Sequence, residues 1–396
     1  MKFTKSLLFI LLVCCVVMFV SLNAGAQSKK EAAKKDVKPE EIFKITTEVK
    51  CTPVKSQDRA GICWSFSTVS FLESELLRMG KEEFDLSEIY PVRWLYPLKA
   101  KNFIRNHGGA PHSPGGQAHH VIDCLRAAGI VPDDVYSGLN LGEKKHNHSE
   151  LGNVLQGMLD GVLKSNRPTL RWLEAYEAVL DIYLGKVPET FSYKGTTYTP
   201  KKFSDEVLGL NPDDYIEVTS YMYLPYYKQV CLDIPDNFEH NSKYYNVPLE
   251  DFERLVDYAI TNGYSMVWDG DFSEKELDTR TKGYAIIPEK AFEDKTPIEQ
   301  AVDFKYYDKE KEITPEVRQK LFDNYTTTDD HLMHLVGIAS TQEGKKFYRI
   351  KNSHGTDRAY GGYLYLSRAF FLGKTTAILV HKNGIPQDLK EKLGIK

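Results

Sequence analysis

Apolar residues recur at helical spacing in several stretches of the first 330 positions. In the first of these, Phe66, Val69, Leu72 and Leu76 repeat every three or four residues and Gly80 follows as a stop, which predicts a buried helix over 63–79. The same pattern predicts further helices over 117–128, 151–163, 171–184, 249–262 and, after the start signal Thr314-Pro315, 315–324. The front of the chain is therefore expected to be largely helical.

The pattern changes after residue 330. Short runs rich in β-branched and aromatic residues follow one another over 334–340, 345–353, 361–367 and 375–381, and glycines separate them. A helical front half and a strand-rich back half predict an α+β protein with two lobes.

The N-terminus has the pattern of a secretory signal. Lys2 and Lys5 precede an apolar run over 7–20, and the small residues Ala24-Gly25-Ala26 follow it. We expect a signal peptide over 1–26, a polar, lysine-rich tether over 27–41 and export to the periplasm or the extracellular space. The apolar run is too short for a stable membrane span, so no membrane insertion is expected after cleavage. A lipoprotein signal is the alternative, but Cys14 and Cys15 lie inside the apolar run.

Composition, charge and the spacing of His and Cys residues argue against nucleic-acid binding and against a metal site. The chain is 42% hydrophobic and 12% aromatic, enough for a sizeable core, and its net charge is -4 without the basic clusters that nucleic-acid binding needs. His119-His120 and His146-x-His148 have no second pair at ligand spacing, so we expect no metal and no cofactor. The other cysteines of the processed chain match no zinc or redox spacing and either form one bridge or stay unpaired: Cys51, Cys124 and Cys231.

Cys63 is the first candidate for chemistry. It begins the predicted helix over 63–79, where the helix dipole favours the thiolate over the thiol. Gln57 stands six positions earlier, in a stretch that reads QDRAGICWSFS. This stretch resembles the papain-like cysteine peptidases, in which the cysteine is the nucleophile and the glutamine amide helps to form the oxyanion hole.

Two later segments extend the resemblance. The stretch DHLMHLVGI is similar to the family's histidine segment and selects His331 as the general base, with His334 packing nearby. The stretch KNSHGT is similar to the segment whose asparagine orients that histidine, which selects Asn352. His354 stands where the family has tryptophan. The resemblance also implies that Gly115 and Gly116 let the substrate backbone approach and pair with the protein as a strand.

The resemblance implies a papain-like two-lobed fold. A helical lobe over 42–139 would carry the nucleophile and a β-barrel lobe over 296–380 would carry His331 and Asn352. A largely helical insertion and connecting segment would fill 140–295, and a tail would follow over 381–396. Asp269 and Asp271, a conceivable glycosidase pair, are interpreted as turn residues.

Ala60, which replaces a disulfide cysteine of papain, and the long insertion resemble the bleomycin hydrolase and aminopeptidase C branch. That branch implies an aminopeptidase acting on peptides, often as a homo-oligomer, with the C-terminal tail lying in the cleft. A surface helix over 388–393 is the alternative for the tail. The alternatives for function are an exported endopeptidase and, because of His354, a non-catalytic peptide-binding protein.

Overall fold

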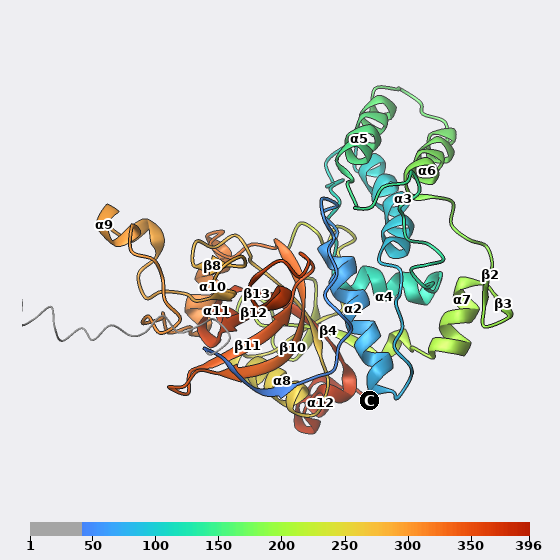
Figure 1. The fold of residues 1–396 in the computed structure, drawn as a ribbon. Helices are drawn as coiled ribbons and strands as arrows, with labels where there is room; N and C mark the ends of the chain where they lie inside the picture. Colours follow the sequence, from blue (N-terminus) through green and yellow to red (C-terminus); the bar gives the residue numbers. More distant parts are fainter. Residues whose placement is uncertain (1–41) are drawn as a thin grey trace, which may run out of the picture. The chain divides into compact units, whose positions relative to one another are not determined.

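A computed structural model describes residues 42–396, apart from the side chain of Glu293, and Figure 1 shows its ribbon. The predicted signal peptide and tether lie outside the described residues. Residues 43–396 form a single compact unit. Within the described part, no helix combines the length and apolar character needed to cross a bilayer.

The predicted helices are present with small shifts at their ends. The described helices are α2 (Cys63–Arg78), α3 (Ile89–Arg105), α4 (Ala118–Ala127), α5 (Ser149–Leu163), α6 (Arg171–Leu184), α7 (Pro200–Lys202), α8 (Leu249–Thr261), α9 (Pro297–Gln300), α10 (Pro315–Asp323), α11 (Arg368–Lys374) and α12 (Gln387–Leu393). A π-helical turn over Phe203–Leu208 continues α7. Only α3 was not predicted among the long helices.

Most strands belong to one large sheet. The described strands are β1 (Lys44–Glu48), β2 (Phe191–Tyr193), β3 (Thr196–Tyr198), β4 (Tyr215–Thr219), β5 (Lys228–Val230), β6 (Tyr244–Asn246), β7 (Met266–Gly270), β8 (Leu277–Asp278), β9 (Tyr284–Ala285), β10 (His331–Ser340), β11 (Lys346–Lys351), β12 (Tyr363–Ser367) and β13 (Thr375–His381). The sheet runs β5-β6-β4-β13-β7-β10-β11-β12-β9-β8, with β1 also paired to β10. Strands β2 and β3 form a separate hairpin.

The expected β-barrel lobe is not confirmed, because the described sheet is open and its ends, β5 and β8, do not close a barrel. The mixed α/β content agrees with the predicted class. Strands β4 to β9 come from 140–295, so this segment builds half of the sheet as well as supplying helices.

Two hydrophobic cores support this architecture. One gathers α2 to α6 with the side chains of Val267, Leu332 and Leu379 from the sheet. The other lies between the opposite sheet face and α8, α11 and α12. Since burial of large apolar side chains is the main stabilising contribution, each core holds its elements independently. Helix α2 packs directly on β10 and β7 (Figure 1).

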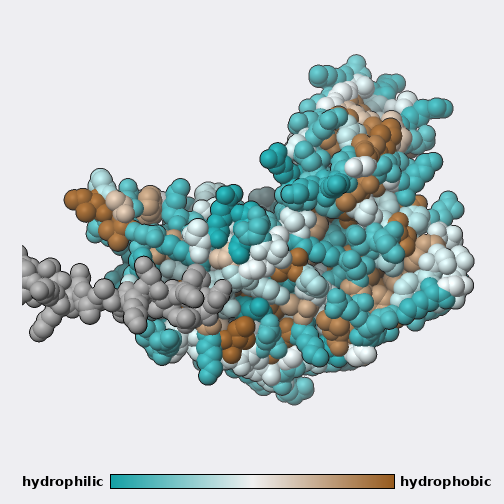
Figure 2. Space-filling view, viewed as in Figure 1, coloured by the Kyte–Doolittle hydropathy of each residue, from teal (hydrophilic) through white to brown (hydrophobic). Residues whose placement is uncertain are grey.

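Exposed apolar side chains are concentrated on few elements. Leu170 and Ile182 on or beside α6 are 84% and 59% exposed, and Ile298 and Val302 at α9 are 82% and 71% exposed. Figure 2 shows brown patches over α6 and α9, while polar residues cover most of the rest of this face.

Candidate active site

Cys63 is the first residue of α2 and is partly exposed. The next residue, Trp64, is buried and donates from Nε1 to the Pro114 carbonyl at 3.0 Å, which anchors the helix start. The backbone of Leu332 forms a hydrogen bond with the Cys63 thiol. Because Leu332 follows His331 in β10, the start of α2 contacts the strand that carries the candidate base.

His331 and Asn352 are in direct contact. The Nε2–H of His331 donates to Asn352 Oδ1 at 2.8 Å, and the backbone N–H of Ser353 donates to the same oxygen at 2.8 Å. Both side chains are almost fully buried. Because Nε2 carries the proton in this hydrogen bond, Nδ1 of neutral His331 is left as the acceptor.

Two rings enclose the imidazole of His331. The ring of Phe272 lies 4.5 Å from it, and the ring of His354 stacks on it at 5.1 Å with an interplanar angle of 29°. Nδ1 of His354 also accepts a hydrogen bond from Asn352 Nδ2 at 3.2 Å. His354 thus contacts both His331, by stacking, and Asn352, by a hydrogen bond. Phe272, which sequence reasoning missed, packs against His331 as well. Burial, followed by the charge of Arg358, lowers the pKa of His354, so it stays a neutral acceptor.

Gln57 is oriented by a residue that no motif singled out. The Ser353 hydroxyl donates to Gln57 Oε1 at 2.7 Å, and the Gln57 backbone N–H donates to the Ser353 carbonyl at 2.9 Å. With its oxygen occupied, the amide presents its Nε2 donors elsewhere. This is the orientation that an oxyanion-hole donor needs.

Burial determines most of the electrostatics of the resting site. Burial and, to a smaller extent, the charges of Asp236, Asp269 and Asp329 raise the pKa of the Cys63 thiol to about 12. Burial also lowers the pKa of His331 to about 4, with His354 contributing. Burial therefore opposes the effect of the helix dipole, because it disfavours both the thiolate of Cys63 and the imidazolium of His331; the thiolate expected from the sequence stays a prediction.

Gly115 and Gly116 lie against other groups. A methyl group on Gly116 would lie 2.9 Å from the Trp64 ring, and one on Gly115 would lie 2.0 Å from Asp236 Oδ2. The Gly115 carbonyl accepts a hydrogen bond from Lys99 Nζ at 2.5 Å. The groups that lie close to the two glycines are thus side chains of the protein itself, and the approach of a substrate backbone stays a prediction.

The interpretation of Asp269 as a turn residue is wrong. Asp269 belongs to β7, is 3% exposed and lies in register with Leu332 of β10, so it is part of the floor of the site. Asp271 does hold a turn, because its Oδ1 accepts from the Ser273 backbone at 2.9 Å. Asp329, two residues before His331, accepts from Gln117 Nε2 at 3.0 Å through both oxygens.

The other candidate residues have packing roles. His119 is paired with Glu217 at 2.9 Å, and His334 contacts Ser70 of α2 at 2.8 Å. Within residues 42–396, no group of three or more His, Cys, Asp or Glu side chains is arranged to hold a metal ion. The four cysteines of this part are free thiols, the second of the two expected outcomes.

A groove of about 1310 Å³ adjoins the site at His354. It is lined by residues that include Ser56, Asp58, Arg59, His146, His354 and Arg358. Both signs of charge are present, so the groove suits a peptide backbone better than an ion of one sign.

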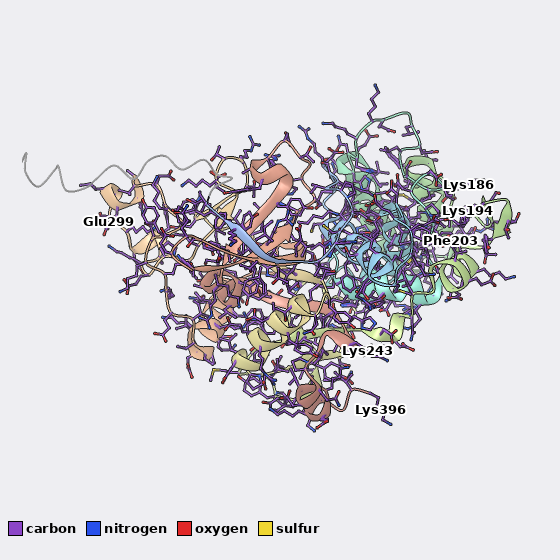
Figure 3. All side chains as sticks on the ribbon, turned by 60° about the horizontal axis from the view of Figure 1, so that its bottom comes forward. Lys186, Lys194, Phe203, Lys243, Glu299 and Lys396 are labelled. Carbon is purple, nitrogen blue, oxygen red and sulfur yellow. The ribbon has the colours of Figure 1, made fainter. Side chains whose placement is uncertain are left out.

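The C-terminal tail forms α12 on the body of the protein, and the prediction that it lies in the cleft is wrong. Leu389 and Leu393 are buried in the core beside α8, and Asp388 pairs with Arg254 at 2.8 Å. The ring of Tyr264 stacks on His381, which precedes the tail. The guanidinium of Arg78, the last residue of α2, lies over the same Tyr264 ring. The tail thus begins at the end of α2 opposite Cys63, about 24 Å away along a 16-residue helix. Figure 3 labels Lys396 beside α12.

Comparisons with known proteins agree with this geometry. The model of the Peptidase C1-like family matches residues 174–395, and that of the papain family cysteine proteases matches residues 39–94. The chain is 25% identical to aminopeptidase G of Lactobacillus delbrueckii subsp. lactis over 394 residues, which cover 88% of this chain and 85% of that protein. It is 23% identical to aminopeptidase C of Lactococcus lactis subsp. lactis, over 85% and 82% of the two chains.

A solved structure shares the fold. The crystal structure of PepW from Lactobacillus rhamnosis superposes with a TM-score of 0.68 and 18% identity, covering 96% of this chain and 94% of that one. The fold is therefore of the same type over nearly the whole length.

Proposed function

The chain belongs to the Peptidase C1-like family, and we propose that it is a cysteine aminopeptidase that uses Cys63 as nucleophile, His331 as general base and Asn352 to orient the histidine. The observation that carries the proposal is the hydrogen bond between His331 Nε2 and Asn352 Oδ1, at the start of the strand whose Leu332 backbone contacts the Cys63 thiol. This is the spatial relation that nucleophile, base and orienting group require.

The reaction follows from the positions of these groups. Nδ1 of His331 takes the thiol proton as the Cys63 sulfur attacks the carbonyl carbon of the scissile bond. The Cys63 backbone N–H and Gln57 Nε2 donate to the resulting oxyanion. The protonated His331 then gives its proton to the leaving amine, and water hydrolyses the thioester with His331 again as base.

Restriction to the amino end rests on two kinds of support. Relatives that align over most of the chain are named aminopeptidases. The groove beside His354 leaves room for the departing peptide, whereas Asp236 occupies the space over Gly115 on the acyl side. We interpret the two hydrophobic cores as the cores of the two lobes of a papain-like fold.

Covalent labelling tests the proposal. A peptidyl epoxide should modify Cys63, as located by peptide mapping, and Cys63→Ala and His331→Ala should each abolish hydrolysis of an aminoacyl amide while unfolding at the wild-type temperature. Labelling at another residue, or turnover by either folded variant, would contradict the assignment of Cys63 as nucleophile and His331 as general base.

We also propose that the enzyme is exported, on the strength of the charged start, the apolar run 7–20 and Ala24-Gly25-Ala26. Amino-terminal sequencing of the protein from its natural source should begin at Gln27. A mature protein beginning at or near Met1 in the cytosolic fraction would contradict export.

A further inference from the structure

We propose that Asp236, backed by Asp329, binds the α-ammonium group of the substrate and thereby closes the cleft on the acyl side. This inference rests on the proposed function and adds to it the group that selects a free amino terminus. The selecting carboxylate would be a side chain of the 231–241 segment, which joins β5 to β6, and not the carboxylate of Lys396, which lies beyond α12.

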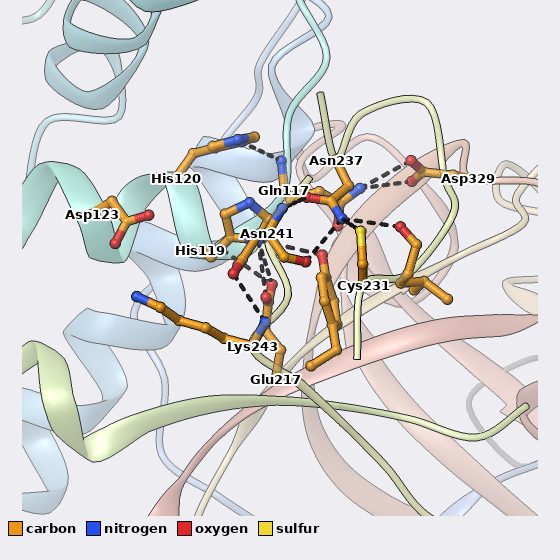
Figure 4. Close-up of polar contacts among 12 residues, drawn as sticks. Gln117, His119, His120, Asp123, Glu217, Cys231, Asn237, Asn241, Lys243 and Asp329 are labelled. Carbon is orange, nitrogen blue, oxygen red and sulfur yellow. Dashed lines mark hydrogen bonds and ion pairs between the residues drawn. The ribbon is translucent and has the colours of Figure 1, made fainter. Parts of the chain in front are cut away.

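The 231–241 segment crosses from the sheet to the helices. Phe238 stacks on His120 of α4 at 5.0 Å, and its carbonyl accepts from Asn102 of α3 at 3.3 Å. Asn237 folds the segment on itself: its Nδ2 donates to the Leu232 and Asn241 carbonyls, and its Oδ1 accepts from the Asn241 backbone (Figure 4). Asp236 is consequently held on a fixed support.

Asp236 is directed at the predicted substrate path. Its Oδ2 would lie 2.0 Å from a methyl group on Gly115, and its Oδ1 accepts from Ser113 Oγ at 3.4 Å. The side chain is half-buried and its charge acts on the Cys63 thiol, so it is within electrostatic reach of the reacting bond. A peptide that continued past Gly115 on the acyl side would have to displace this carboxylate.

The carboxylates beneath Asp236 have no cation of their own. Among the described residues, none of Asp236, Asp269 and Asp329 forms an ion pair within 4.0 Å. Asp269 is 3% exposed, and burial followed by the charge of Asp329 raises its pKa well above the ordinary value, so its neutral form is favoured and the negative charge resides on Asp236 and Asp329. Burial and the charge of Asp236 raise the pKa of Asp329 to about 7.

Buried carboxylates without a counter-charge are costly, and a bound cation removes that cost. The neighbouring Lys99 offsets this cost only in part: the charges of Asp236 and Asp329 act on its ammonium, but that ammonium donates to the Gly115 carbonyl and lies over the Phe238 ring. One ammonium beside two carboxylates leaves room for a second positive charge next to the acyl end of the cleft. The α-ammonium of an amino-terminal residue, two bonds from the carbonyl under attack, supplies that charge in the right place.

A lysine side chain at the second residue from the bond could supply the same ammonium chemistry. The position of Asp236 over Gly115 favours the α-ammonium, because the path of a second residue is already occupied. Three fluorogenic substrates separate the two sources: leucyl, N-acetyl-leucyl and N-acetyl-lysyl-leucyl aminomethylcoumarin. The wild type should cleave the first and discriminate strongly against both blocked substrates.

The deciding variant is Asp236→Asn, which keeps the shape of the side chain and removes its charge. We expect kcat/KM for the free-amine substrate to fall about 10- to 150-fold, the factor that a hydrogen bond to a charged group is worth, with no fall for N-acetyl-leucyl aminomethylcoumarin. Asp233→Asn, an exposed residue of the same segment, is the matched control and should leave both values unchanged. Asp236→Ser is a second variant should the first prove unstable on thermal unfolding.

The outcomes separate this inference from the proposed function. Unchanged free-amine preference in a folded Asp236→Asn, with Cys63 still labelled by the epoxide, would overturn the role of Asp236 alone. Efficient wild-type cleavage of the N-acetyl-lysyl substrate would overturn it in favour of a side-chain pocket. Failure of the wild type to cleave any of the three substrates or to accept the epoxide at Cys63 would instead remove the peptidase proposal itself.

Discussion

Ser353→Ala removes the hydroxyl that fixes the amide of Gln57, and its effect on turnover can be worked out from the structure. The hydroxyl donates to Gln57 Oε1 at 2.7 Å inside a buried contact. Without it the amide can rotate and present its oxygen, not its N–H, to the developing oxyanion. A hydrogen bond between neutral groups contributes about 0.5–1.5 kcal/mol, which corresponds to roughly a 2- to 13-fold loss in kcat.

Loss of the whole donor is larger. Gln57→Ala should lower kcat by about 10²- to 10³-fold, as removal of one oxyanion donor does elsewhere. KM should change little in either variant, because the donor acts on the transition state and not on the bound substrate. Ser265→Ala is the control, since it removes a similarly buried hydroxyl that has no partner among the described residues.

The double variant gives the decisive comparison. If Ser353 acts only through Gln57, adding Ser353→Ala to Gln57→Ala should cost nothing more, so that the two effects are far from additive. Steady-state kinetics on an aminoacyl aminomethylcoumarin measure all four enzymes. A further 2- to 13-fold loss in the Gln57→Ala background would show that Ser353 acts on catalysis by another route and would refute the reasoning.

Three other predictions follow from the site and the tail. Because the pKa of Cys63 is about 12 and that of His331 about 4, alkylation of Cys63 by iodoacetamide should rise close to tenfold per pH unit between pH 6 and 9, whereas a plateau across this range would indicate a preformed thiolate–imidazolium pair. His354→Phe keeps the stacking on His331 but removes the acceptor for Asn352, so kcat should fall about 2- to 13-fold with stability nearly unchanged; full activity would mean that the hydrogen bond has no part in orienting Asn352. Deleting 393–396 removes the buried Leu393 and should lower the free energy of unfolding, measured by urea titration, by about 1.5–3 kcal/mol. The preference for substrates with a free amine should not change. Loss of that preference would show that the C-terminal tail, and not Asp236, selects the free amino terminus.

Local hydrophobic pattern and motif spacing predict most of the long helices of the molecule correctly. The helix that begins at Cys63 and α6 were predicted almost to the residue because their apolar spacing is regular. Helix α3 was missed because Pro91 and Pro97 interrupt its sequence. It forms nevertheless, since Tyr90, Val92, Leu95 and Phe103 are buried in the helical core and tertiary packing outweighs local preference.

The parts of the site that were missed have no local signal. Asp236 is a loop residue far from every motif, and its position over Gly115 depends on how 231–241 folds across α3 and α4. Phe272 reaches His331 only because β7 pairs with β10. The sequence predicts a turn at Asp269, because alternating acids after an apolar run usually form turns. The pairing of β7 with β10 that buries this side chain has no local signal in the sequence.

The protonated thiol of the resting enzyme has a consequence for its chemical durability. Peroxides and other oxidants attack the thiolate, so a cysteine whose proton is retained to about pH 12 is converted slowly to sulfenic acid. Burial is the main cause of this protonation, and the charges of Asp236, Asp269 and Asp329 add to it. We therefore expect peroxides to inactivate the enzyme only slowly while no substrate is bound.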